Sequence, residues 1–447
     1  MSLAKAYSKD AYYFSQLKSV HPIEWSGLNA LSERGMIDVH KPKTLCVFGP
    51  LIDSPPSHPD TVLSTMEYLD HTLKSLGMVE VHLKLDMQLY IVACLIKWND
   101  PIRWRSIILR PGMMHTLMSF IGTIGYTMKA TGIDELVGSA FGGIPNILNG
   151  KAWPKSMRAF RMIVAALLDS FLEGEKSHDD IIRYLDRARN HPTGKLWVDC
   201  FIIPTLIAHR FLRAEREGDW LLQQECLDIM LPYFFVAGHH HYARYISWHL
   251  RDMQHISPGA KRDLLDGAHV CRHTQGAAAV SADQFGEQTY IKQGKQAGGM
   301  KGISTNPDQV KVWIESHSVC SHLSMAMDEM YHPLGKAVSS SPKHREEGRH
   351  RQELDKEDRN MILDKLKSHS NPLTDHSTSL YNIINGQVAS TDDVTVHNAI
   401  EIGQRLQKDF AASLPGGFHN PIKKTVKTMQ VLKRGVKVKD KTVYELE

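Results

Sequence analysis

Cysteine is scarce in this sequence, and long apolar runs are absent from it. The 6 cysteines in 447 residues are widely spaced and form no CxxC pair, which disfavours a disulfide framework and favours reduced thiols inside a cell. The longest apolar stretches, such as residues 91–96, are far shorter than the roughly 20 residues that a membrane span needs. The opening MSLAKAYSKDAYYF has no apolar core of a signal peptide. We therefore expect an intracellular protein, in the nucleus or the cytoplasm, that is not secreted and has no membrane partner.

A large excess of one charge is also missing. Lysine and arginine total 53 and aspartate and glutamate 49, so the net charge is +4 with the histidines neutral, which alone is weak evidence for a polyanionic partner. Hydrophobic residues make up 42% of the chain, enough to bury a core, and the length suits two or three domains. The 25 histidines make the surface more basic as they gain protons near pH 6.

Alternating strand and helix patterns begin the ordered part of the sequence. In VEVHLKLD, residues 79–86, apolar and polar residues alternate, which is typical of a half-buried strand that ends at Asp86. The pattern predicts strands over 44–53, 79–86 and 104–110, and helices from Pro59 to Gly77, over 87–98, and from Met113 to about Lys129. This order predicts a small α/β unit with a few parallel strands.

The remainder is predicted to be mainly helical. Pro204 and Pro232 are expected to kink or interrupt its best helical segment, and Gly218 to separate two helices. The predicted division of the chain is an N-terminal extension over 1–43, the α/β core over 44–130, a helical domain or insertion over 131–256, a Gly/Ala-rich segment with a helix that closes the core over 257–332, a charged linker or solvated helix over 333–360, and a helical region with a basic tail over 361–447.

Three consecutive histidines stand in GHHHYARYISWHLRDM, residues 238–253. Adjacent residues of a helix point in different directions, and His241 and His249 are about two turns apart, too far for one ion without a third element. A zinc site is therefore disfavoured against a structural or capping role. We interpret the stretch as a helix start with His239 near the cap and with Tyr242 and Tyr245 packed inward.

Carboxylates give the main candidate site. Asp86 ends a strand, and Asp283 and Glu287 are four residues apart, on one face of a predicted helix. Brought together in space, such groups can hold Mg²⁺ for phosphoryl transfer, because hard cations prefer carboxylate oxygens. The structural alternative for Asp86 is an N-cap of the helix that starts at Met87, and this is the more common role of aspartate at that place.

Basic residues give a second candidate. The tail over 423–441 holds eight lysines or arginines and one aspartate, which suits either nucleic-acid binding by charge or a solvated tail. Arg244 is either solvated or in contact with a phosphate. The candidates for binding DNA or RNA are Arg244, Lys423, Lys424, Lys433, Arg434 and Lys437.

Several blocks, taken together, resemble a large uncharacterised family. The family is formally a domain of unknown function, occurs in many copies in invertebrate, fish and fungal genomes, and is similar in copy number and company to mobile-element proteins. The blocks are LIDSPPSHPDTV (51–62), LDMQLY (85–90), LRPGMMHTLMSFIGTIG (109–125), FLRAEREGDW (211–220), MLPYFFVAGHHHYARY (230–245) and ADQFGEQ (282–288).

The resemblance implies a transposase-type RNase H-like core with Mg²⁺ as its metal. Asp86 would match a carboxylate at a strand end, and Glu287 the last acid, in a block that resembles D-x-x-x-E-Q. Both would be the metal ligands, and Asp283 and His115 are weaker catalytic candidates. Many members carry an acid where this chain has Met113, and longer members have an upstream segment with a further acid. We therefore expect a truncated or decayed copy that is inactive as a nuclease but still binds nucleic acid.

Another hypothesis comes from a different class of protein. A non-enzymatic helical module would bind a protein partner through a groove near residues 242–248, although the sequence does not identify that partner. Salt-dependent binding of DNA separates the two hypotheses, because only the first predicts it.

Overall fold

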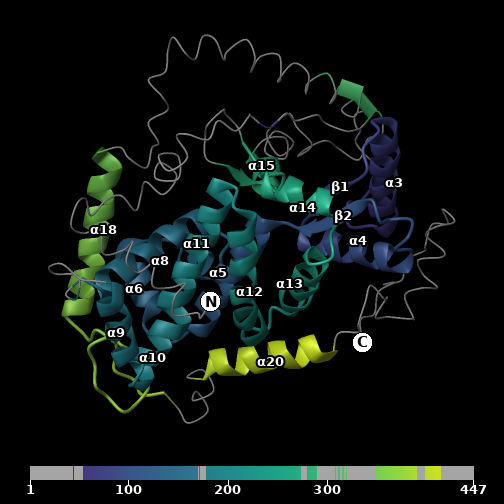
Figure 1. Ribbon diagram of the computed structural model, residues 1–447. Helices are drawn as coiled ribbons and strands as arrows, with labels where there is room; N and C mark the ends of the chain where they lie inside the picture. Colours follow the sequence, from purple (N-terminus) through teal and green to yellow (C-terminus); the bar gives the residue numbers. More distant parts are fainter. Residues whose placement is uncertain are drawn as a thin grey trace.

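Two parallel strands and the helices beside them form the N-terminal part of the fold (Figure 1). The structure is a computed structural model that describes residues 44, 54–169, 171, 178–272, 279–288, 308, 311–312, 315–316, 319, 349–389 and 398–413. The elements of this part are helix α3 (Pro59–Ser75), strand β1 (Val81–Leu85), helix α4 (Met87–Asn99), strand β2 (Ile107–Pro111) and helix α5 (Met113–Thr127). The predicted order of these strands and helices is confirmed, while nearly all of the strand predicted over 44–53 lies outside the described residues.

β1 and β2 pair in parallel, as the α/β pattern predicted. Leu83 is opposite Leu109 and Lys84 is opposite Arg110. β2 begins at Ile107, later than the predicted start at residue 104, because residues 101–106 form turns. Parallel strands need a crossover, and α4 provides it.

Both faces of this small sheet are covered, although the sequence predicted a half-buried strand. Leu83 and Leu109 belong to the main apolar core. On the opposite face, Ile108 packs with Trp220, Met253 and other residues of three later helices in a second, smaller cluster. The polar side chains that alternate with the apolar ones in β1 are therefore half-buried under a protein layer.

The rest of the described chain is helical, as predicted. Pro204 lies at the start of α11 after a short π-helical segment, and Pro232 lies inside α12 without ending it, so the predicted interruption at Pro232 is wrong. Gly218, with φ +72°, ends α11 as predicted. The helices are α6 (Ile133–Ala140), α7 (Ile144–Leu148), α8 (Trp153–Leu167), α9 (His178–Ala188), α10 (Pro192–Trp197), η1 (Val198–Ile202), α11 (Ile203–Glu217), α12 (Trp220–Val236), α13 (His240–Met253), α14 (Pro258–Leu265), α15 (Ala282–Gln288), α18 (Arg349–Lys367) and α20 (Ala399–Ser413).

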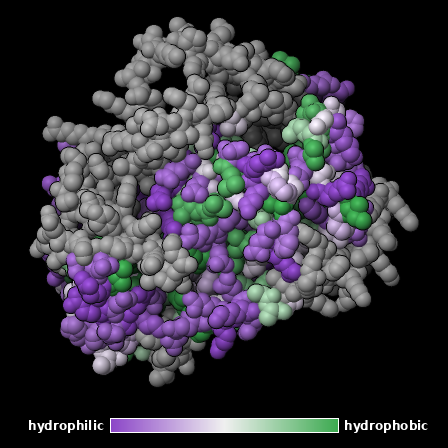
Figure 2. All heavy atoms as spheres, viewed as in Figure 1, coloured by the Kyte–Doolittle hydropathy of each residue, from purple (hydrophilic) through white to green (hydrophobic). Residues whose placement is uncertain are grey.

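The described residues contain no sheet large enough to identify an RNase H-like core. Besides β1 and β2, they hold one antiparallel pair, β3 (Val270–Cys271) and β4 (Val280–Ser281). The fold is thus mainly helical with a small α/β unit. None of the helices in the described part of the chain combines the length and the apolar character needed to cross a membrane. On the face in Figure 2, apolar side chains of the described residues lie in separate patches among hydrophilic ones.

α18 attaches to the helical region through a buried carboxylate. Asp355, which is 5% exposed, accepts a hydrogen bond from Arg158 Nε at 2.5 Å and one from Arg161 Nη2 at 3.2 Å. Both arginines lie on α8, against which α18 packs. The segment predicted as a linker or solvated helix therefore includes, from residue 349, a helix with one packed face.

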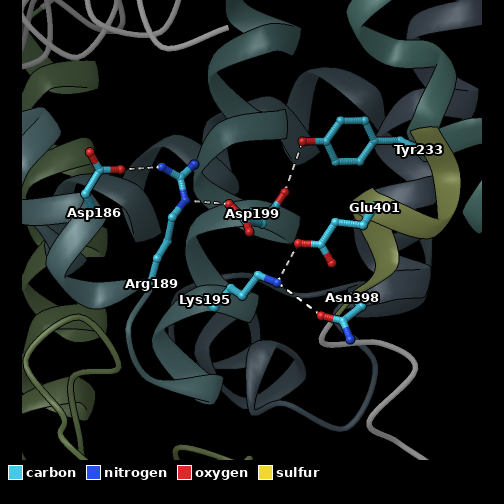
Figure 3. Close-up of polar contacts among 7 residues, drawn as sticks. All are labelled: Asp186, Arg189, Lys195, Asp199, Tyr233, Asn398 and Glu401. Carbon is cyan, nitrogen blue, oxygen red and sulfur yellow. Dashed lines mark hydrogen bonds and ion pairs between the residues drawn. The ribbon is translucent and has the colours of Figure 1, made fainter. Parts of the chain in front are cut away.

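α20 lies along α12, and polar contacts hold its first turn (Figure 3). Lys195 Nζ donates to Asn398 Oδ1 at 3.1 Å and to Glu401 Oε1 at 2.8 Å. In the same region, Arg189 Nε donates a hydrogen bond to Asp199 Oδ1 at 2.7 Å. Because partly exposed ion pairs contribute little, we attribute the docking of α20 chiefly to close packing on α12.

Gly403 makes this close packing possible and provides a test of it. A Cβ at Gly403 would overlap the carbonyl oxygen of Pro232 on α12. We expect Gly403→Ala to lower the free energy of unfolding by about 1–2 kcal/mol, since an overpacking cost of about 1–3 kcal/mol exceeds the gain in helix propensity. Urea unfolding measures the change. Gly142→Ala, whose Cβ meets nothing within 4 Å, is the control, and equal loss in both variants would contradict the packing argument.

Candidate functional site

The candidate site lies at the carboxyl ends of β1 and β2, where each strand leads directly into a helix. In open α/β sheets, ligands bind at this edge. Asp86 follows β1 and is the N-cap of α4, because its Oδ1 accepts a hydrogen bond from Leu89 N at 2.9 Å. The capping alternative for Asp86 is therefore confirmed, and the Asp86 residue remains exposed.

The N-terminus of α5 is closed by a residue from a distant helix. Its own N-cap, Gly112, has no side chain to offer. Asp283 of α15 accepts hydrogen bonds from Met114 N at 3.2 Å and from His115 N at 3.1 Å. A Cβ at Gly112 would lie 2.7 Å from Asp283 Oδ2, so glycine is what allows the carboxylate to reach the free N–H groups of the first turn.

His115 brings the predicted acids into one electrostatic environment. Its Nδ1 is 3.0 Å from Asp283 Oδ2. This hydrogen bond and the negative charges of Asp283, Asp86 and Glu287 raise the pKa of His115 against the effect of burial. Burial alone would raise the pKa of Asp283, but the hydrogen bonds from His115 and Met114 hold it below its ordinary value. The fold thus gathers all four predicted catalytic candidates around the start of α5.

α13 forms a further wall of this site. Burial raises the pKa of Tyr242, and so do the charges of Asp86 and Asp283. His239 is the N-cap residue of α13, as predicted, and its Nδ1 is 2.7 Å from Ser119 Oγ on α5. Tyr245 is buried and stacks on Trp98, so its predicted inward packing is also confirmed.

The hydrogen bonds that Asp86 and Asp283 accept within the fold limit the capacity of these carboxylates to bind a metal ion. One oxygen of Asp86 caps α4 and both oxygens of Asp283 bind α5. Among the described residues, no group of three or more His, Cys, Asp or Glu is placed to hold a metal ion. Met113, which the resemblance puts at the place of an acid, is buried in the core. Asp86 and Glu287 are the two predicted ligands that would have to hold Mg²⁺.

The predicted basic candidates divide into two groups. Arg244 is exposed on α13. Those of the tail, from Lys423 to Lys437, lie outside the described residues. His269 is buried, and its Nδ1 lies 3.1 Å from Leu264 O.

A buried polar group around Arg110 was missed by the sequence analysis. Arg110 of β2 is 1% exposed, and its Nη2 donates to Gln223 Oε1 at 3.0 Å. Gln223 Nε2 in turn donates to Glu215 Oε1. We call this group the Arg110 compartment, and it comprises His82, Lys84, Arg110, Glu215, Gln223, His249 and His269. The alternation of His82 and Lys84 in β1 was a signal of it, but it was taken for a face in water.

Burial and mutual repulsion set the protonation states in the Arg110 compartment. Burial and the charge of Arg110 lower the pKa of His82 to about 4 and that of Lys84 to about 8. The pKa of His249 is lowered by the same two causes. Burial and the charge of Asp283 raise the pKa of Glu215 to about 7. Near neutral pH the compartment therefore holds more positive than negative charge.

The raised pKa of Glu215 makes stability depend on pH. Its ionised form is disfavoured in the fold, so the stability present below pH 4.5 is lost as pH rises through about 7. We expect wild type to lose about 3 kcal/mol relative to Glu215→Gln over this window. Denaturant unfolding of both proteins from pH 5 to 8 measures the difference, and a constant difference would contradict the prediction.

The carboxylate of Asp283 should matter both for α5 and for His115. We expect Asp283→Asn to lower the pKa of His115, because the opposite charge is lost, and to cost about 1–2 kcal/mol of stability. The loss should be largest between the lowered pKa of Asp283 and the raised pKa of His115, where both are charged. NMR titration and urea unfolding measure the two effects.

Asp86→Asn is the matched control for Asp283→Asn. It removes a negative charge near His115 but keeps an N-cap of similar strength on α4. Its stability should stay within about 0.5 kcal/mol of wild type. If Asp283→Asn were equally mild, Asp283 would not be the cap that joins α15 to α5.

Comparison with known proteins places the chain in a family. A family model described as Domain of unknown function (DUF8702) matches residues 24–187 and 175–446, which together make up most of the chain. No curated protein and no solved structure matches it. The description of the family names no activity and no mobile element. On the extent of the match, the chain belongs to this family of domains of unknown function.

Proposed function

We propose that this chain is a nucleic-acid-binding protein that descends from a mobile-element nuclease of the RNase H-like type and has lost its catalysis. The observation that carries the proposal is the gathering of Asp86, His115, Asp283 and Glu287 at the carboxyl edge of β1 and β2. Two of these residues follow the strands and two come from α15, which lies far away in the sequence. Such an edge is where a metal-dependent phosphoryl transferase of α/β type would hold its acids.

Loss of catalysis is supported by what the acids do in the fold. Asp283 is held by three hydrogen bonds from the first turn of α5, so a metal ion would have to displace them. Mg²⁺ is often bound through one or two carboxylates with water and substrate phosphates, and Asp86 and Glu287 are the pair for such a weak site. A site of two carboxylates lacks a ligand that the two-metal mechanism requires.

Binding without cleavage is supported by the distribution of basic residues. Arg244 is exposed on α13, which also carries Tyr242 beside the acids. The tail over 423–441 adds eight lysines or arginines against one aspartate. Contacts of this kind with phosphates give affinity without reading the base sequence.

The alternative of a protein-binding groove on α13 has less support. Its proposed aromatic lining is used inside the fold, because Tyr245 and Trp248 are buried against Trp98. Rings in the core of a domain contribute to its stability and are not exposed to a partner.

Fluorescence anisotropy with labelled double-stranded and single-stranded DNA tests the proposal. We expect binding that weakens steeply as salt rises from 50 to 200 mM. Lys433→Gln/Arg434→Gln should reduce the slope of log K against log salt by about one to two units. Lys356→Gln/Lys408→Gln removes two exposed charges elsewhere and should leave the slope unchanged.

A cleavage assay completes this experiment. Supercoiled DNA incubated with the wild-type protein and Mg²⁺ or Mn²⁺ should remain uncut. Robust cleavage that disappears in Glu287→Gln would show that catalysis survives, and would overturn that half of the proposal. Absence of salt-dependent binding to either form of DNA would overturn the other half.

A further inference from the structure

The buried face of the β1–β2 sheet carries cationic side chains at adjacent positions. Lys84 and Arg110 are register partners in parallel strands, so their side chains lie next to each other on one face. His82 lies on the same face, two residues before Lys84. α13 contributes His249, and the segment before β3 contributes His269. Arg110 acts on the titration of Lys84 and of all three histidines, which places these groups around it.

Several buried donors of this group have no hydrogen-bond partner among the residues that the structure describes. They include Nε and Nη1 of Arg110, which is 1% exposed. Both ring nitrogens of His249, which is 0% exposed, are also unmatched. Buried guanidinium groups are normally satisfied by carboxylates, carbonyls or anions, because an unmatched buried charge is costly.

Charge in the compartment is equally unmatched. Lys84 and Arg110 stand against one fully buried carboxyl group, that of Glu215, which Gln223 separates from Arg110. Lys84 Nζ donates to Ala268 O at 2.9 Å, and the charge of Asp283 also acts on Lys84. A cation would be repelled by these residues. An oxyanion fits, because its oxygens accept from guanidinium nitrogens and its charge offsets theirs.

The compartment reaches the surface along the β1 edge of the sheet. His82, Lys84 and Cys271 are half-buried, while Arg110 and His249 behind them are fully buried. An anion that enters beside Lys84 therefore meets a gradient of increasing burial that ends at Arg110.

We propose that the Arg110 compartment binds a small oxyanion of the phosphate class, held by Arg110 with Lys84 at the entrance. The oxygens of the anion accept hydrogen bonds from the unmatched nitrogens of Arg110. This site uses other residues than the carboxylate edge and does not depend on nucleic-acid binding elsewhere on the chain.

Isothermal titration of the full chain with inorganic phosphate at constant ionic strength tests the proposal. We expect saturable binding of one phosphate per chain and a matching rise in the midpoint of thermal unfolding at low millimolar concentration. Arg110→Gln should weaken binding about tenfold to a hundredfold, since it removes a charged donor. Arg183→Gln, on the exposed side of α9, is the matched control and should bind as wild type does.

The pH dependence of sulfate binding provides a second test, because Arg110 would not produce it if its role were only structural. The charge of sulfate is constant over the range used, whereas Glu215 and Lys84 lose protons between pH 6.5 and 8.5. Binding of sulfate should therefore weaken several-fold over this range as the compartment becomes less positive. Lys84→Gln, at the half-buried entrance, should weaken the binding of sulfate at pH 6.5 and reduce its dependence on pH. This variant replaces Arg110→Gln in the test if Arg110→Gln does not fold.

A 5′-phosphorylated oligonucleotide and an unphosphorylated oligonucleotide of the same sequence test whether the ligand is a free anion or a terminal phosphate of nucleic acid. Competition with inorganic phosphate by the phosphorylated form alone would assign the second source, and no competition would assign the first. Absence of saturable binding by the wild-type chain, or equal binding by wild type, Arg110→Gln and Lys84→Gln, would overturn the proposal and indicate a compartment filled by water.

Discussion

Covering both faces of a two-stranded parallel sheet is the constraint on which the rest of this structure depends. Two strands alone do not form a stable sheet in water, and parallel strands are normally buried on both sides. α4 and α5 supply one cover soon after the strands, but the other comes from α12, α13 and α14, more than a hundred residues later. Because β1 alternates apolar and polar residues, this second cover encloses His82 and Lys84 together with Arg110.

The carboxylate of Asp283 anchors α15 to the start of α5. Its hydrogen bonds to α5 span 168 and 169 residues of sequence, so the first turn of α5 is complete only when α15 has docked. This structural duty competes with catalysis, since a side chain that satisfies three donors has little capacity left for a metal ion. The same residue thus explains why the acids converge and why a working metal site is not required to keep them together.

Local patterns in the sequence were sufficient to predict the order of strands and helices, the parallel pairing, the start of α13 at His240 and the cap at Asp86. Their determinants lie within a few residues of each other. Contacts across long separations were not predictable in this way. Nothing near Lys84 indicates that it will donate to Ala268 O, and nothing near Gly112 indicates that Asp283 will cap α5. The helix at 349–367 was ambiguous for the same reason, because Asp355 is explained only by two arginines of α8.

The acidic edge and the cationic face of the sheet are linked through Glu215. The negative charge of Asp283 raises the pKa of Glu215, and an oxyanion beside Arg110 would act in the same direction, since like charge disfavours ionisation. Neutral Glu215 leaves more positive charge around Arg110 than ionised Glu215 does. By linkage, an anion bound there stabilises the protonated form of Glu215. The same anion opposes the ionised form of Asp283, which the hydrogen bonds at the start of α5 hold in place.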